Sequence, residues 1–124
     1  MILDSDVIIE VLRGNSGTVE WLRAQRAAQV PLRYSPVSRA EIRAGSRSLE
    51  RSAIAALFGS LTAIPIEAST GEVAGEQLAK FGPSHGVQMG DALIAAAAIE
   101  HADDLATFNA RHFPGVLRIV KPAR

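Results

Sequence analysis

Cysteine is absent from this sequence of 124 residues, which excludes a disulfide framework, a thiolate nucleophile and a zinc site with cysteine ligands. Lysine is scarce: only Lys80 and Lys121 are lysines among the 13 basic residues, and the rest are arginine, whose planar guanidinium suits phosphate and carboxylate. Aromatic residues make up only 5%, which argues against base stacking as the main way of binding a nucleic acid. The three histidines are never three or four residues apart, so no helical zinc motif is present.

Long hydrophobic runs are also missing. The longest, "ALIAAAAI", is far shorter than the roughly 20 residues that span a bilayer, and the first apolar run ends on an acid at Asp4, unlike a signal peptide. We therefore expect a soluble, cytoplasmic protein without a membrane partner. The formal net charge of zero excludes a uniformly basic surface but not a local basic patch. The length and the 48% hydrophobic content predict one domain, residues 1–124, with a sizeable core.

Strand-like and helix-like segments alternate along the chain. Extended segments are predicted at residues 1–3, 30–37, 62–66, 104–108 and 116–120, and helices at 6–14, 16–28, 38–45, 49–61, 69–82 and 90–102. This alternation predicts an α/β fold, a three-layer α/β/α domain with a central parallel sheet flanked by helices. In such a fold the carboxyl ends of the strands share one edge, where ligands bind.

Four oxygen-bearing side chains follow strands or begin helices at that edge: Asp4, Glu41, Asp91 and Asn109. Each also has a local explanation. The sequence from Ser38 to Glu41 fits a capping box, Asp91 suits the positive end of its helix, and Asn109 suits a turn. Asp4 is the hardest to explain locally, because it ends a buried strand.

Acids that lie close together repel one another, and their pKa values rise unless a cation lies among them. Oxygen ligands without cysteine or paired histidine favour a hard divalent ion, so we expect Mg²⁺, with Mn²⁺ as the alternative. Asp6, close to Asp4, could cap the first helix instead.

Three segments together carry a family resemblance: "LDSDVIIEVLRG", "SPVSRAEIRAG" and "HGVQMGDALIAAAAIEHADDLATFNARHF". With the overall length, they resemble the PIN-domain ribonucleases, specifically the VapC-type toxins of bacterial toxin–antitoxin pairs. The resemblance implies that Asp4, Glu41 and Asp91 are the metal-binding acids. Asn109 stands where many members carry a fourth acid, and Asp6 where asparagine is more usual, so a second metal and the role of Asp6 stay open.

The resemblance implies a Mg²⁺-dependent endoribonuclease that cleaves RNA phosphodiesters with metal-activated water and is neutralised by a cognate VapB-type antitoxin. Asp4, Glu41, Asp91 and Asn109 would form the catalytic centre. Ser5, Asp6 and Thr107 are expected to support the metal ligands, although Ser5 and Thr107 could serve only as structural hydrogen-bonding groups. A homodimer is also expected. The dimer interface is expected among the apolar residues of the first two helices: Val7, Ile8, Val11, Val19, Trp21 and Leu22.

Arginine is concentrated between residues 23 and 51, a span with seven arginines and two glutamates. Arg39, Arg43, Arg47 and Arg51 recur every four residues, as on one face of a helix, and the first three are predicted to bind the RNA backbone. Gly45 interrupts this row, and a solvated helix face is the alternative.

Other protein classes fit less well. A receiver domain needs an acceptor aspartate near mid-chain, yet residues 45–65 contain none, and a dehalogenase-like phosphatase normally needs a longer chain with a lysine near its acids. A PIN nuclease acting in RNA processing outside a toxin pair, or a catalytically silent PIN-like module that binds RNA or a partner, shares most of the pattern. Retention of Asp4, Glu41 and Asp91 together favours an active enzyme.

Overall fold

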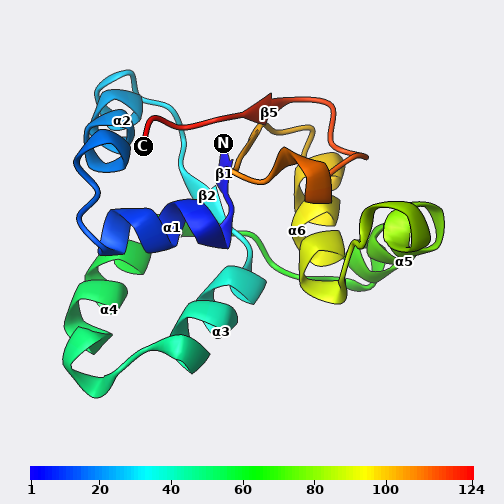
Figure 1. Ribbon diagram of the computed structural model, residues 1–124, viewed down its shortest axis with the longest axis horizontal. Coiled ribbons are helices and arrows are strands. Elements are labelled where there is room, and N and C mark those ends of the chain that lie inside the picture. Colours follow the sequence, from blue (N-terminus) through cyan, green and yellow to red (C-terminus); the bar gives the residue numbers. More distant parts are fainter.

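A parallel sheet of five short strands forms the centre of the computed structural model, which describes residues 1–124 (Figure 1). The strands are β1 (Ile2–Leu3), β2 (Arg33–Tyr34), β3 (Thr62–Ala63), β4 (Leu105–Ala106) and β5 (Ile119–Val120). Their spatial order is β3-β2-β1-β4-β5, and every pairing is parallel. The chain thus starts at the centre of the sheet, builds one side through β2 and β3, and then crosses to build the other.

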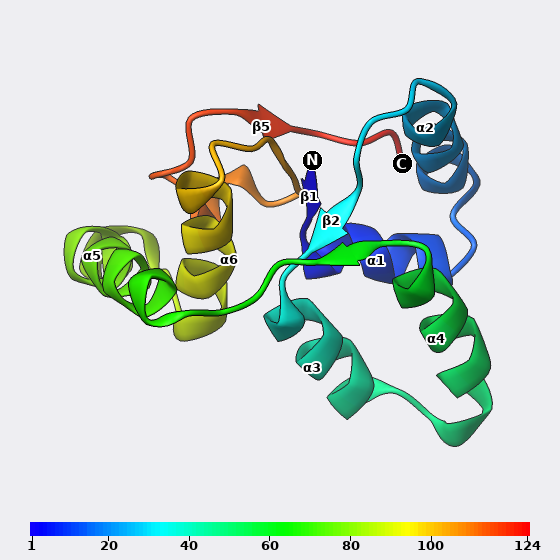
Figure 2. The ribbon, with the colours of Figure 1, turned by 180° about the vertical axis from the view of Figure 1, so that it is seen from behind.

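Six helices connect the strands: α1 (Ser5–Leu12), α2 (Ser16–Ala27), α3 (Pro36–Gly45), α4 (Arg51–Gly59), α5 (Ala68–His85) and α6 (Met89–Glu100). Two single-turn 3₁₀ helices, η1 (Ser48–Glu50) and η2 (Ala110–His112), precede α4 and follow β4. Figure 2 shows α5 and α6 on one side of the molecule and α1 to α4 on the other. None of the helices combines the length and the hydrophobicity that a membrane-spanning segment needs.

Alternate residues of β1 enter two different hydrophobic cores. Leu3 packs with Val7 and Ile8 in a core formed with α1, α2 and α4, whereas Ile2 packs with Ile94 of α6 in the core on the opposite face. Alternation across a strand explains this division, because successive side chains point to opposite faces. Helix α5 packs on α6 in a third, smaller cluster. Both faces of the sheet are therefore covered, and the predicted three-layer α/β/α fold is confirmed.

All predicted helix ends but one lie within two residues of the observed ends, and two of the differences have a structural explanation. Helix α3 begins at Pro36 rather than Ser38, because the Ser35 hydroxyl accepts the Val37 N–H at 3.2 Å and caps the helix, and proline suits the first helical position. Helix α5 continues beyond Gly82 to His85. It ends at Gly86, whose φ of +66° gives a left-handed cap.

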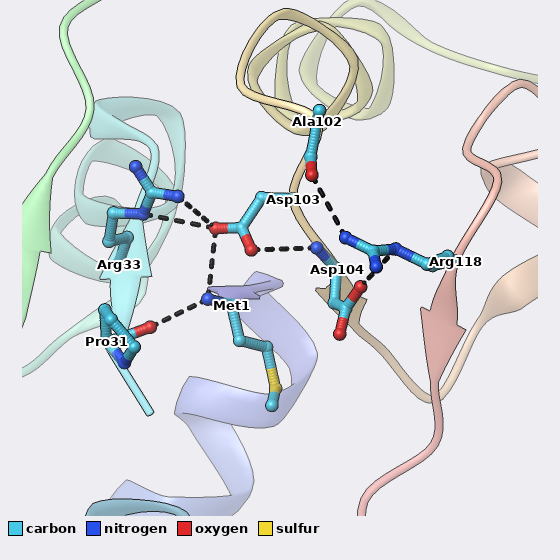
Figure 3. A network of polar contacts seen from close by, with 7 residues as sticks. All are labelled: Met1, Pro31, Arg33, Ala102, Asp103, Asp104 and Arg118. Carbon is cyan, nitrogen blue, oxygen red and sulfur yellow. Dashed lines mark hydrogen bonds and ion pairs between the residues drawn. The ribbon is translucent and has the colours of Figure 1, made fainter. Parts of the chain in front are cut away.

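An ion-pair network holds the strands together at the edge of the sheet opposite Asp4 (Figure 3). The Asp103 carboxylate lies 3.0 Å from the Met1 ammonium and accepts a hydrogen bond from Arg33 Nε at 3.1 Å. The ammonium also donates to the Pro31 carbonyl at 2.7 Å. Burial of Asp103 opposes ionisation, but these hydrogen bonds outweigh it and lower its pKa. The network therefore ties the starts of β1 and β2 to the segment that leads into β4.

The apolar residues of the first two helices do not form the exposed surface from which a dimer was predicted. Val7, Ile8 and Leu22 are buried, and Val11 and Trp21 pack against the same core. They are needed to cover one face of the protein's own sheet. Val7, Ile8 and Leu22 therefore cannot belong to the predicted interface, whereas Val11, Val19 and Trp21 are only partly buried, and dimerisation stays a prediction without an assigned interface.

Candidate active site

The polar residues predicted to meet at one edge of the sheet do lie at the carboxyl ends of β1, β2 and β4. Asp4 follows β1 and caps α1, and Thr107 follows β4 directly. In Figure 1, β1 runs down to the start of α1, and α3 begins beside it. Short loops at these strand ends place the first turns of the helices around the same spot.

Asp4 is the most buried of these acids, with 7% of its surface exposed. Its Oδ1 accepts the Ser5 N–H at 2.7 Å, and its Oδ2 accepts the Thr107 hydroxyl at 2.8 Å. Burial, followed by the negative charge of Asp6, raises the pKa of Asp4 to about 7. A cation next to Asp4 would oppose both effects and favour the ionised form.

Ser5 connects the first helix to Glu41. Its hydroxyl oxygen lies 2.8 Å from the hydroxyl of Ser38 and 2.9 Å from Glu41 Oε1. The alternative capping-box role of Ser38 and Glu41 is wrong, because Ser35 caps α3 and Glu41 reaches across to α1 instead. Glu41 is thereby held next to Ser5, the residue that follows Asp4.

Asp91 lies in the first turn of α6, where its Oδ2 accepts the Gln88 N–H at 3.2 Å. Asp91 therefore has a capping contact in addition to its expected place at the positive end of the helix, but only one of its oxygens is used. The neighbouring Gly90 lies against Glu41: a Cβ at Gly90 would be 3.7 Å from Glu41 Oε2. The first turn of α6 is thus packed next to the acid on α3.

Asn109 and His112 complete this edge. The Asn109 side-chain nitrogen lies 2.8 Å from His112 Nδ1, and that ring nitrogen is 3.7 Å from Asp91 Oδ2. Asn109 is also the residue directly before η2, so it has the turn position that was its local explanation. His112 is not among the predicted site residues, because the spacing of the histidines bears only on a zinc motif. Its place three residues after Asn109 was the available signal.

Asp6 does not cap the first helix; Asp4 does. The Asp6 Oδ2 accepts the Phe108 N–H at 3.0 Å and lies 3.3 Å from the Thr107 hydroxyl. Its other oxygen is buried without a hydrogen-bond partner. Such an unsatisfied acceptor is unusual in a protein interior and marks a place where a water or cation would be favourable.

The donor set suits a hard divalent cation, since it consists of carboxylate, hydroxyl and amide oxygens around a buried acid. No three histidine, aspartate or glutamate side chains lie close enough together to hold a metal by themselves. Mg²⁺ commonly keeps several waters and uses only one or two carboxylates, so this arrangement is compatible with the ion. Asp4, Glu41 and Asp91 could therefore hold it together with ordered waters, with one or two of these acids as direct ligands.

The predicted RNA-binding arginines lie apart from the acids. Arg39 and Arg43 are on α3, and Arg47 comes after the helix ends at Gly45, as the position of that glycine suggested. The largest cavity, about 530 Å³, lies at the other end of α6 and contains none of the four predicted catalytic residues.

Comparison with known proteins identifies the family. The family model "PIN domain" matches residues 1–116. Ribonuclease VapC10 of Mycobacterium tuberculosis is 37% identical over 115 residues, covering 92% of this chain and 86% of the relative. Ribonuclease VapC19 of the same organism is 30% identical over 114 residues, covering 91% of each chain.

Solved structures show the same fold. The VapBC2 complex of Rickettsia felis bound to a promoter DNA fragment contains a chain that matches with a TM-score of 0.79 at 21% identity, covering 96% of both chains. A chain of a toxin–antitoxin complex from Klebsiella pneumoniae matches with a TM-score of 0.79 at 19% identity, covering 97% of this chain and 95% of the other. Sequence match and fold agree: this chain belongs to the PIN-domain family and, within it, to the VapC-type ribonucleases.

Proposed function

We propose that this protein is a divalent-metal-dependent endoribonuclease, the toxin of a type II toxin–antitoxin pair, and that a VapB-type antitoxin neutralises it. The observation that carries the proposal is the 37% identity to Ribonuclease VapC10 over 92% of the chain. The acids at the sheet edge support it, because they offer the oxygen ligands that phosphodiester hydrolysis with Mg²⁺ or Mn²⁺ needs. RNA is then the substrate.

Asp4, Glu41 and Asp91 would hold the ion. When bound, a divalent cation neutralises charge on the phosphate and lowers the pKa of water for attack. The protein's own contribution is orientation. The Ser5 hydroxyl fixes Glu41 Oε1, and the Gln88 N–H fixes Asp91 Oδ2, so in both acids the other oxygen is open to the ion or its waters.

Thr107 has a positioning role in this proposal. Its hydroxyl lies within hydrogen-bond distance of both Asp4 and Asp6, and it also accepts the Asn109 N–H at 3.0 Å. One side chain thus sets the relative positions of three predicted site residues. Ser5 has the corresponding role between Asp4 and Glu41. Such supporting contacts commonly change metal affinity or activity by about 10–100-fold when they are removed.

The test compares two acids on one helix. Purified protein is incubated with total RNA in EDTA, Mg²⁺ or Mn²⁺, and the cleaved ends are mapped. Asp91→Asn, at the start of α6, should abolish cleavage, whereas Glu100→Gln, at its exposed end, should cleave like the unmodified protein. Circular dichroism checks that both variants fold. Cleavage that continues in EDTA, or in folded Asp91→Asn, would overturn the metal-centre assignment.

The toxin function has its own test. Expression in a bacterial host should stop growth, and the Asp91→Asn variant should not. Co-expression of the small DNA-binding protein expected to be encoded next to this gene should restore growth and form a stable complex. A chain that cleaves RNA in vitro but neither slows growth nor binds that neighbour would instead be a PIN nuclease of RNA processing.

A further inference from the structure

Three arginines from two helices line one hollow on the surface. Arg39 and Arg43 come from α3 and Arg51 from the first residue of α4, and they surround a space of about 340 Å³ together with Ile54 and Ala55. Arg47, which the four-residue spacing includes in the same row, is not part of the lining. The break after Gly45 therefore replaces the predicted row by a concave site to which Arg51 contributes.

The charge of this hollow is not neutralised within the protein. Five other arginines have a carboxylate oxygen within 4 Å: Arg13, Arg23, Arg33, Arg118 and Arg124. Arg39, Arg43 and Arg51 have none, and no acid lines the hollow. Three unpaired guanidinium groups facing one concavity repel one another, and an anion placed there would remove that repulsion.

Arg39 is held in place before any ligand binds. Its Nη1 donates to the Tyr34 hydroxyl at 3.1 Å, and its guanidinium carbon lies 5.4 Å from the centre of the Phe58 ring. Tyr34 and Phe58 are buried, so both contacts are with fixed groups. A guanidinium that is already oriented loses less side-chain entropy when it binds.

We propose that this hollow, defined by Arg39, Arg43 and Arg51, binds backbone phosphates of the RNA outside the cleaved bond. The inference rests on the proposed ribonuclease function and extends it. Arg39 and Arg43 are each two residues from Glu41, about 200° around the helix, so they lie on the side of α3 away from Ser5. An RNA strand must pass across a helix about 10–12 Å wide to reach them, and so only flanking nucleotides can do so.

The chemistry of the hollow favours phosphate over a protein segment. A planar guanidinium fork matches phosphate oxygens, and three of the five residues that line the hollow are arginines. A second hollow on the α1 side of the same helices is different. It has a volume of about 210 Å³ and is lined by eight residues, which include Ile9, Leu12, Ile42 and Ile54 as well as Arg13 and Glu50. Its one arginine is accompanied by one glutamate, so it lacks the concentration of positive charge that three arginines give the other hollow.

Binding can be measured without cleavage by using Asp91→Asn as the background. The dissociation constant of a fluorescent single-stranded RNA is measured against KCl concentration. The test variant carries Arg39→Gln, Arg43→Gln and Arg51→Gln, and the matched control carries Arg23→Gln, Arg26→Gln and Arg118→Gln, with the same change of net charge. For an RNA of about 20 nucleotides, the log–log salt slope should fall by about 2 in the test variant, since each lost phosphate contact removes about 0.7, and stay unchanged in the control.

Length dependence makes the test specific. An RNA of about two nucleotides, whose single linking phosphate occupies the acid edge, should bind both variants equally, because it has no flanking phosphate to place in the hollow. In the cleavage-competent protein the triple change should raise KM on long RNA and leave kcat unchanged. The double variant Arg43→Gln/Arg51→Gln keeps the contacts of Arg39 with Tyr34 and Phe58, so it guards against misfolding.

The outcomes separate the two proposals. An unchanged salt slope on long RNA, in a protein that still cleaves it, overturns the hollow and leaves the ribonuclease. If the triple change weakens binding of an acidic peptide but not of RNA, the RNA proposal is also overturned, and the hollow binds a protein partner instead. Failure of the unmodified protein to bind or cleave any RNA overturns the proposed function itself.

Discussion

Replacing Asp4 by asparagine should make the metal-free protein more stable at neutral and alkaline pH. The folded pKa of Asp4 is about 7, against 3.8 for the ordinary carboxyl, and burial is the main cause, followed by Asp6. The difference is about 3 pKa units, and one unit corresponds to about 1.4 kcal/mol, so the ionised carboxylate destabilises the fold by about 4 kcal/mol. Asparagine keeps the shape of the side chain and removes this charge.

The effect depends on pH in a defined direction. Below pH 3.8, Asp4 is protonated in both the folded and the unfolded chain, so its ionisation does not change stability. Between pH 3.8 and 7 the folded protein keeps a proton that the unfolded chain releases, so its stability falls as the pH rises. Above pH 7 both states are ionised and the full loss is present. Asp4→Asn should therefore gain stability, relative to the unmodified protein, across this window and level off above it.

Urea unfolding at a series of pH values in EDTA measures this difference. Asp103→Asn is the matched control, because the pKa of Asp103 is lowered and its pH-dependent contribution is confined to more acidic solutions. Adding Mg²⁺ at pH 8 should stabilise the unmodified protein more than Asp4→Asn, since a cation offsets the buried charge. A stability difference between the two proteins that is constant from pH 4 to pH 8 would refute the argument.

Three further substitutions test other contacts. Asp103→Ala should lower the free energy of unfolding by about 3–5 kcal/mol, because it leaves the N-terminal ammonium and Arg33 without their carboxylate. Arg118→Ala, at a largely exposed ion pair, should lower it by about 1 kcal/mol or less. Equal losses of stability in urea unfolding would contradict this prediction. Asn109→Asp should lower the Mg²⁺ concentration needed for half-maximal RNA cleavage, because hard cations prefer charged oxygen ligands. If the dependence of the cleavage rate on Mg²⁺ concentration does not change, Asn109 is only a turn residue. His112→Ala should slow cleavage about tenfold without changing the melting temperature, since the side chain contacts Asn109 at the candidate site, and an unchanged rate would remove it from that site.

The sequence predicted the architecture and the edge of the sheet at which the acids lie. Alternating strands and helices imply a parallel sheet, and an acid that directly follows a buried strand must lie at its carboxyl end. Asp4 lies where this order of elements predicts, and Glu41 and Asp91 lie at the same edge of the sheet. This prediction needed only the order of the elements along the chain.

Contacts between distant segments could not be predicted in this way. Ser38 and Glu41 have the spacing of a capping box, but the Ser5 hydroxyl, from another helix, is the partner of Glu41 in the folded protein. His112 and Asn109 meet within the single turn of η2, and a turn alone does not predict which of its side chains are in contact. The four-residue spacing includes Arg51 in one row with Arg39, Arg43 and Arg47, but only the fold shows that Arg51 shares a hollow with Arg39 and Arg43 and that Arg47 does not.

Strand β1 contains only two residues, yet it is attached to its neighbour at both ends. The Met1 ammonium pairs with Asp103 before the strand, and Asp4 accepts the Thr107 hydroxyl after it. Each added residue lengthens a strand by about 3.3 Å and reverses the face of every side chain beyond it. One inserted or deleted residue would therefore break one of the two attachments and turn Ile2 or Leu3 toward the wrong core. The three-residue spacing from Met1 to Asp4 thus limits both evolution and engineering, and changes of length will be tolerated in the surface loops instead.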